Sequence, residues 1–197
     1  QVKKNEEEVA YGTDKVTWTL YNLHEYNFSA EIPDYTMEQI VPSHEEKVVS
    51  NWSVKLVDLE NTLYPNYITT ANLLFSPENA EEVFACGQGC AQEHSINVSI
   101  FKNEGAKSIG DIKDLFLSNL EKSAEGQYDM ALTSKEQTKW DHQVVSFEYN
   151  DMMGTNQKGY ILSNPTFVYI VEYFISSTPK ESFEIANKVI DSFEFGN

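Results

Sequence analysis

The segment from Pro165 to Gly196 constrains the fold most strongly, because a long apolar strand there leads directly into a helix. Successive side chains of a strand point to opposite faces. One face of this strand carries Phe167, Tyr169, Val171, Tyr173 and Ile175, and the other carries Val168, Ile170 and Phe174. Because both faces are apolar, both must be covered. We therefore expect a central strand of a sheet with further layers on both sides.

The helix that follows is defined by its capping residues. Thr178 is a natural N-cap, Pro179 fits the first helical position, and Glu181 lies three residues after the cap. This is a capping box with a proline preset for the first turn. One apolar face is expected at helical spacing, formed by Phe183, Ala186, Ile190 and Phe193.

The charge of the chain excludes several classes of partner. The formal net charge is -17, and all 14 basic residues are lysines, since the sequence contains no arginine. Arginine supplies the two-pronged recognition of phosphates and guanine edges. A strongly negative chain also gains nothing from counterion release on DNA or RNA and is repelled by anionic membrane surfaces. Nucleic-acid binding is therefore not expected.

The beginning of the chain is polar and charged, and residues 1–14 are predicted to be a disordered tail or tether. No apolar run reaches the 18 or so residues typical of a transmembrane helix. Since the first residue is Gln1 and not methionine, a removed segment can precede it. We expect an extracytoplasmic protein that is periplasmic, on the cell surface or secreted, with a lipid anchor as one form of tether.

Alternating apolar residues predict a series of strands. They fall at 16–32 (two strands ending at Pro33), from 52, at 67–75, 95–102, 130–133, 138–149 and 158–163, followed by the strand described above. Ser76-Pro77 is expected to start a short helix, and Ser108 a longer one. Asn164-Pro165 predicts a tight turn. Closely spaced strands favour antiparallel pairing, because parallel pairs need long crossovers. The pattern is that of an α+β sandwich.

The order of these elements resembles the PsbP-like superfamily, which includes a photosystem II extrinsic subunit and bacterial secreted proteins and lipoproteins. The resemblance rests on the early strand ending Phe28-Ser-Ala-Glu-Ile-Pro33, the strand and helix over 96–122, and the closing Ala186-Asn-Lys-Val-Ile-Asp-Ser-Phe193. It implies a three-layer α/β/α sandwich with a central, mainly antiparallel sheet. It also implies a single domain over 15–197, with an elaboration around 61–94.

For function, the resemblance implies a binding or assembly module without a shared catalytic site. No functional residue of the family matches a motif in this sequence, so no role is carried over. We therefore expect a non-enzymatic protein without a cofactor, whose partner is an unknown protein or small ligand. The sequence leaves its oligomeric state open.

The sharpest local motif is Cys86-Gly-Gln-Gly-Cys90, followed by His94. The spacing could place three metal ligands on one helical face, but Gly87 and Gly89 weaken a helix and no second cysteine pair completes a zinc shell. A local Cys86–Cys90 disulfide is the favoured interpretation, because the glycines allow so short a loop to close. Two free thiols rank second, and a metal site of Cys86, Cys90 and His94 ranks third.

An enzyme with a cysteine nucleophile near 86–94 is the alternative from another functional class, although no family signature surrounds either cysteine. His24 and His142 fall in predicted strands beside aromatic residues, so structural roles are favoured. Asp141 and His142 are adjacent, and in a strand they would point to opposite faces, which argues against a catalytic dyad.

The three tryptophans offer one further alternative. Trp18, Trp52 and Trp140 are expected to pack in the core, as is usual in a sheet covered on both faces. Exposed aromatic residues on strands would instead form a platform for ligand stacking or partner docking. Solvent exposure separates these two interpretations.

The disulfide interpretation has a direct test. Alkylation of the unfolded, unreduced protein is expected to add no mass, because both thiols are bonded. Alkylation after reduction should then add two labels. Bound zinc or copper that is lost in Cys86→Ser together with thermal stability would favour the metal site instead. Rapid, pH-sensitive labelling of a single cysteine would favour the nucleophile.

Overall fold

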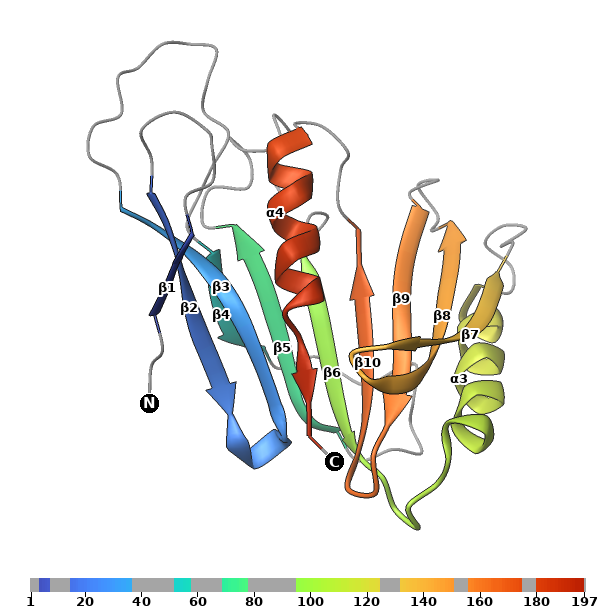
Figure 1. Cartoon of the computed structure of the whole chain (residues 1–197). Helices are drawn as coiled ribbons and strands as arrows, with labels where there is room; N and C mark the ends of the chain where they lie inside the picture. Colours follow the sequence, from blue (N-terminus) through green and yellow to red (C-terminus); the bar gives the residue numbers. More distant parts are fainter. Residues whose placement is uncertain are drawn as a thin grey trace. The chain divides into compact units, whose positions relative to one another are not determined.

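The computed structural model describes residues 4–7, 15–36, 52–57, 69–77, 95–124, 132–150, 156–174 and 180–196. These residues form an α+β fold with mainly antiparallel sheets and two α-helices (Figure 1). The chain divides into two compact units. Unit 1 comprises 1–54, 75–95 and 175–196, and unit 2 comprises 55–74, 96–174 and the last residue.

Unit 1 contains a four-stranded sheet. Its order is β1 (Lys4–Glu7), β2 (Lys15–Leu23), β3 (Phe28–Thr36) and β11 (Glu194–Phe195), and each neighbouring pair is antiparallel. A short 3₁₀ turn, His24–Tyr26, joins β2 to β3 and ends at Asn27 in the left-handed conformation (φ 49°). The helix α4 (Lys180–Asp191) packs against β3.

Two prolines belong to strands that were expected to stop at or before them. β3 continues through Pro33 to Thr36, with Pro33 opposite Trp18 of β2. β11 pairs only with Phe28 and Ser29, so among the described residues Pro33 has a strand neighbour on its β2 side alone, the kind of edge position where a proline is tolerated in a sheet. Likewise β5 (Thr69–Pro77) includes Ser76 and Pro77, so a helix does not start at these two residues, and the rest of the helix predicted there lies outside the described residues.

The core of unit 1 is aromatic. Phe28, Phe75, Phe193 and Phe195 are all buried, and the ring of Phe28 lies 5.2 Å from both Phe193 and Phe195 between centroids. The buried face of α4 is formed by Ile185, Ala186, Val189 and Ile190. Phe183 was expected on this face, but 36% of its surface is exposed, because it lies at the border of the stripe that those four residues form at 100° per residue.

Seven strands form the second sheet. Its order is β4 (Trp52–Leu56), β5, β6 (Ile96–Lys102), β10 (Phe167–Tyr173), β9 (Asn156–Ser163), β8 (His142–Asn150) and β7 (Thr133–Lys139). β10 pairs antiparallel with both β6 and β9. All five residues from Phe167 to Val171 are buried, so both faces of this strand are covered. The central position predicted from its two apolar faces is confirmed.

The β7–β8 hairpin differs from the expected single strand over 138–149. The chain turns at Trp140 and Asp141, and both residues have positive φ angles (53° and 60°). Lys139 and His142 close the two-residue turn as a strand pair. Positive φ at both central residues is the geometry of a type I′ hairpin turn. The sequence did not predict this turn, because Asn-Gly is its usual signal and Trp140-Asp141 does not match it.

The helix α3 (Ile109–Ala124) begins at a cap that the sequence predicted correctly. The Oγ of Ser108 accepts a bond from the backbone N–H of Asp111 at 3.4 Å, and the carboxylate of Asp111 accepts from the N–H of Ser108 at 3.2 Å. This reciprocal pair is a capping box with aspartate in place of glutamate.

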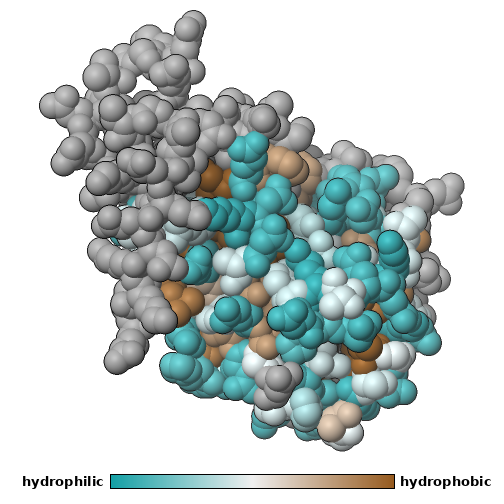
Figure 2. Space-filling view, viewed as in Figure 1, coloured by the Kyte–Doolittle hydropathy of each residue, from teal (hydrophilic) through white to brown (hydrophobic). Residues whose placement is uncertain are grey.

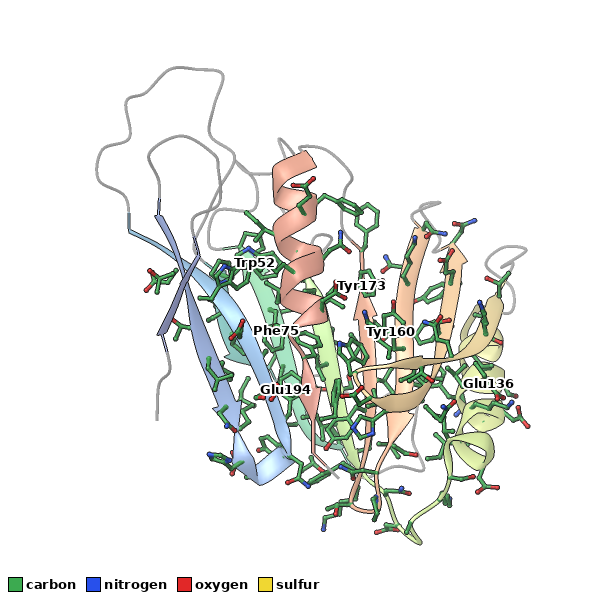
Figure 3. All side chains as sticks on the ribbon, in the orientation of Figure 1. Trp52, Phe75, Glu136, Tyr160, Tyr173 and Glu194 are labelled. Atoms are coloured by element: carbon green, nitrogen blue, oxygen red, sulfur yellow. The ribbon has the colours of Figure 1, made fainter. Side chains whose placement is uncertain are left out.

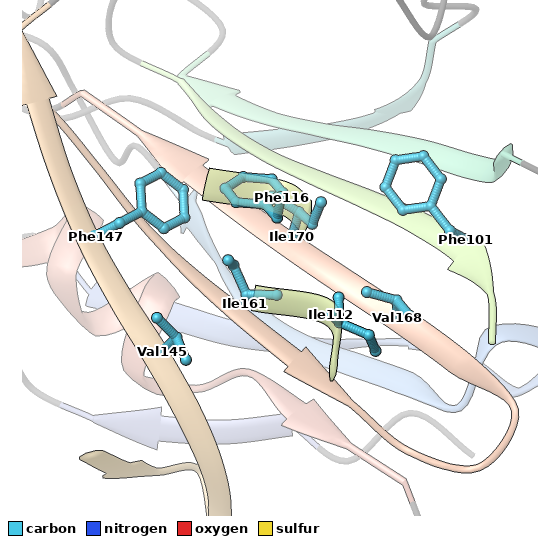
Figure 4. Packing of buried hydrophobic residues seen from close by; sticks show 8 residues of the cluster. All are labelled: Phe101, Ile112, Phe116, Val145, Phe147, Ile161, Val168 and Ile170. Atoms are coloured by element: carbon cyan, nitrogen blue, oxygen red, sulfur yellow. The ribbon is translucent and has the colours of Figure 1, made fainter. Parts of the chain in front are cut away.

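The buried face of α3 packs on the sheet of unit 2 (Figure 4). Its Ile112 and Phe116 join a buried cluster with Phe101, Val145, Phe147, Ile161, Val168 and Ile170. Phe116 and Phe147 have ring centroids 5.1 Å apart. We call the sheet face that carries these residues the α3 face.

The turn between β9 and β10 depends on Asn164, and it confirms the predicted Asn164-Pro165 turn. The Asn164 side-chain oxygen accepts from the N–H groups of Thr166 (2.9 Å) and Phe167 (2.7 Å). Its amide nitrogen donates to the Tyr169 hydroxyl at 3.1 Å, and Asn103 donates to the Asn164 carbonyl at 2.7 Å. Asn164 can be buried here because its polar groups are paired within the protein.

One close approach inside unit 2 gives a prediction about stability. A Cβ at Gly159 would lie 2.3 Å from Cζ of Phe147 and 2.4 Å from the carbonyl oxygen of Val171. Gly159→Ala should therefore lower the free energy of unfolding by more than about 2 kcal/mol, since the backbone oxygen cannot move aside easily.

Gly110→Ala is the matched control for this prediction. A Cβ at Gly110 meets only Ser108 Oγ at 3.7 Å, and alanine favours a helix by about 0.5–1 kcal/mol over glycine. Urea unfolding of both variants measures the difference. Equal stability of the two variants would contradict the close packing at Gly159.

Candidate functional site

Three aromatic residues and a lysine gather at the β7–β8 turn in unit 2. The rings of Trp140 and Tyr160 meet edge to face with centroids 5.0 Å apart, and Tyr160 stacks with Tyr173 at 6.1 Å. Lys139 Nζ lies 4.8 Å from the Trp140 ring centroid and 5.4 Å from that of Tyr160. All four side chains are partly exposed. We call Lys139, Trp140, Tyr160 and Tyr173 the aromatic cluster.

The strand register explains why these residues meet. Tyr160 of β9 pairs with Val171 of β10, and Tyr173 is two residues further along the same face. Figure 3 labels Tyr160 and Tyr173, which come from adjacent strands. The α3 face carries Val145, Ile161 and Ile170, so the aromatic cluster lies on the opposite face of the sheet.

The backbone at Trp140 is strained. A bulky residue with positive φ is rare, because its Cβ approaches the backbone, and each such residue costs about 1–3 kcal/mol. Strain of this kind persists where surrounding contacts hold it, and it is often associated with binding sites. The indole of Trp140 is thus held against Tyr160 at the tip of a hairpin and is still partly exposed.

The face that carries the aromatic cluster is locally basic. Lys135 and Lys139 of β7 and Lys158 of β9 share this face, since they pair with Ser146, His142 and Tyr173 respectively. Lys158 also forms an ion pair with the exposed Glu148 (3.5 Å). Such exposed pairs contribute little to stability. Three lysines on one face are notable in a chain whose net charge is -17.

Two of the three tryptophans are core residues, and the third is partly exposed, as the alternative interpretation of a docking platform requires. Trp18 is 3% and Trp52 6% exposed, so both are core residues as expected by default. Lys188 of α4 lies 4.6 Å from the Trp18 ring centroid in unit 1. Only Trp140 of the three is partly exposed, and no signal in the sequence distinguished it from the others.

The residues that the sequence singled out for chemistry either lie outside the described residues or take other structural roles among them. Cys86, Cys90 and His94 lie outside the described residues. His24 lies in the 3₁₀ turn and is exposed, so its predicted place in a strand is wrong. Asp141 is a turn residue, whereas His142 begins β8. The expectation of opposite strand faces for these two therefore does not apply.

Two further features of the described ranges concern metals and membranes. No group of three or more His, Cys, Asp and Glu side chains is arranged to hold a metal ion within these ranges. Neither α3 nor α4 has the length and apolar content that a membrane-spanning helix needs.

A second unusual polar residue is Glu172 in the central strand β10. Burial raises the pKa of its carboxyl group to about 6, and a hydrogen bond from the Tyr149 hydroxyl (3.4 Å) lowers it in part. Glu172 therefore changes charge near pH 6, whereas an ordinary glutamate does so at 4.5. Perturbed carboxyl groups of this kind are enriched at functional sites.

The first prediction from this site concerns Trp140. Trp140→Asn should change the free energy of unfolding by no more than about 1 kcal/mol, because asparagine tolerates positive φ and this gain offsets the lost ring contact. Tyr160→Ala, which keeps the strained turn and loses both ring contacts, should be the more destabilising change. Urea unfolding measures both, and a loss above about 2 kcal/mol in Trp140→Asn would show that the indole serves the fold.

The second prediction concerns the pH dependence of stability. A carboxyl group whose pKa rises on folding opposes folding when ionised, so its contribution is most favourable below pH 4.5 and is lost as the pH rises through about 6. Glu172→Gln should therefore be more stable than wild type at pH 7.5, by about 2 kcal/mol at most, and similar at pH 4.5. Unfolding at both pH values tests this, with the exposed Glu148→Gln as the control. A difference that is the same at both pH values would argue against it.

Comparison with known proteins identifies the fold. The structure is similar to the solution structure of cyanobacterial PsbP (CyanoP) from Synechocystis sp. PCC 6803, with a TM-score of 0.52 and 10% sequence identity over 95% of this chain and 98% of that chain. No family model matches the sequence, and none of the curated proteins matches it. A likeness at this identity establishes the fold alone. The fold is PsbP-like, which confirms the resemblance inferred from the sequence.

Proposed function

We propose that this protein is a non-enzymatic binding or assembly module outside the cytoplasm, secreted or held by a lipid anchor, and that it docks a partner protein on the aromatic cluster. The observation that carries the proposal is the partly exposed Trp140 at a strained turn, packed on Tyr160 beside Lys139. Aromatic residues with a polar rim are enriched where proteins meet. The PsbP-like fold supports the same class of function, and the similarity over 95% of the chain supports the predicted three-layer α/β/α arrangement.

The charges indicate which partner fits. Unit 1 carries 18 acidic residues and 6 lysines, a formal charge of -12, whereas unit 2 carries 13 and 8, a charge of -5. Within unit 2, Lys135, Lys139 and Lys158 share the face of the aromatic cluster. This face is therefore where an acidic segment of a partner is best accommodated, through its carboxylates beside the lysines and an apolar or aromatic side chain against the rings.

The rest of the described surface favours a small, polar contact. Leu56 and Phe183 are the exposed large hydrophobic residues of the described ranges. In the view of Figure 2, the described residues expose mainly hydrophilic side chains, and hydrophobic areas are small and separate. A large, obligate interface would need a wider apolar patch. The proposed contact is accordingly reversible and sensitive to salt.

Site-specific photo-crosslinking in the native host tests this proposal. A benzophenone amino acid at position 173 should give a discrete adduct of higher mass, and the adduct should weaken at least tenfold when Trp140→Asn is added. The same probe at Glu104, an exposed residue between β6 and α3, is the matched control. Equal adducts at both positions, or none at 173, would exclude the aromatic cluster as a docking surface.

A further inference from the structure

Glu172 lies near the end of the central strand β10, where desolvation makes an ionised glutamate costly. Glu172 belongs to β10, and its direct partners in the two neighbouring strands are Asn97 of β6 and Gly159 of β9. It lies on the α3 face, like Val168 and Ile170. It is therefore separate from the aromatic cluster, which lies on the opposite face of the same strands.

Polar residues surround Glu172 on this face. On the α3 face, the strands beside β10 carry Asn97 and Ser99 (β6), Gln157 (β9) and Tyr149 (β8), so that with Glu172 the polar positions cover four adjacent strands. Gly159 has no side chain, and the ring of Phe147 lies over it and stacks on Tyr149 with centroids 6.3 Å apart. The result is a polar row beside the apolar cluster under α3, bordered by two aromatic rings.

The hydrogen bonds of this row leave acceptors in excess. Glu172 accepts one long bond from Tyr149 (3.4 Å), and no lysine of the described residues forms an ion pair with it. The amide nitrogen of Asn97 donates to Ser99 at 3.4 Å, whereas its buried oxygen Oδ1 has no partner. A buried acceptor without a donor costs about 1–3 kcal/mol. These acceptors suit a hydrogen-bond donor, and a positively charged donor suits the carboxylate best.

We propose that Glu172, Asn97 and Tyr149 form a binding site for a primary ammonium group. The ammonium would donate to the Glu172 carboxylate and to Asn97 Oδ1, while the partly exposed Tyr149 ring offers a wall that favours a cation. Three donors on one small cation match acceptors on neighbouring strands, whose Cβ atoms lie about 5 Å apart in direct pairs. The ligand class is thus an organic amine or the side chain of a lysine.

The exposure of the site is consistent with a ligand that arrives from solvent. Glu172 and Tyr149 are only partly buried, so the row can be reached in the folded protein. Burial also makes the ionised carboxylate unfavourable on its own, and a bound ammonium would compensate for its lost hydration. The negative charge of the whole chain raises the local concentration of cations.

The test uses n-butylammonium chloride as the probe at pH 7.5 and constant ionic strength. Amide NMR signals of Asn97, Gly159 and Glu172 should shift and saturate in the full-length wild type. Tetramethylammonium, which is a cation without N–H donors, should give at least tenfold weaker binding. Glu172→Gln should also weaken n-butylammonium at least tenfold, and Glu148→Gln, a carboxyl on the opposite face, should leave it unchanged.

Three results would overturn the assignment: no saturable shift in wild type, equal binding of the two cations, or equal binding in Glu172→Gln and wild type. A further variant, Tyr149→Phe, keeps the ring and removes the hydroxyl. It should retain binding within about threefold, because the ring is kept and the lost hydroxyl only donates to the carboxylate that the ammonium binds. These outcomes are independent of the crosslinking at position 173, which concerns the other face of the sheet.

Discussion

The structure of unit 2 depends on the pairing of β10 along both edges and on the burial of both its faces. β6 and β9 flank it in antiparallel register, so its backbone groups are satisfied within the sheet. Because side chains alternate, its residues contribute to two environments at once. Val168 and Ile170 pack beneath α3, whereas Tyr169 and Val171 are buried on the other face.

The same alternation places the last two residues of β10 in two different environments. Glu172 enters the polar row on the α3 face, and Tyr173 enters the aromatic cluster on the opposite face. Both positions lie where the fully buried run of β10 ends, and both side chains are partly exposed. A sheet that is buried at its centre and accessible at its end offers rigid positions for binding residues, because the strands on each side hold them.

In the β7–β8 hairpin, an unfavourable backbone conformation occurs together with side-chain packing. Trp140 adopts a backbone conformation that a tryptophan rarely adopts, and its ring contact with Tyr160 accompanies that conformation. On the other face of the same hairpin, Glu136 of β7 forms an ion pair with Lys113 of α3. The edge strand β7 is otherwise exposed and charged, which is a common way in which sheet edges avoid pairing with other chains.

The sequence alone determined the elements whose signals are local. Three of them could be predicted: the two apolar faces of β10, the start of α3 at Ser108 and the Asn164-Pro165 turn. Each depends on residues within a few positions of one another. The PsbP-like order of elements followed from the same signals. The default burial of Trp18 and Trp52 was also predicted correctly.

Tertiary structure decided the features that depend on distant partners. The turn at Trp140–Asp141 lacks the glycine that usually marks such a hairpin, and Pro33 lies in β3 beyond the two residues that pair with β11. Phe183 lies on an exposed border that helical spacing alone did not reveal. The aromatic cluster and the row around Glu172 each join three or more strands, so their members are distant in sequence. Strand register, which is set by the packing of whole faces, brings them together.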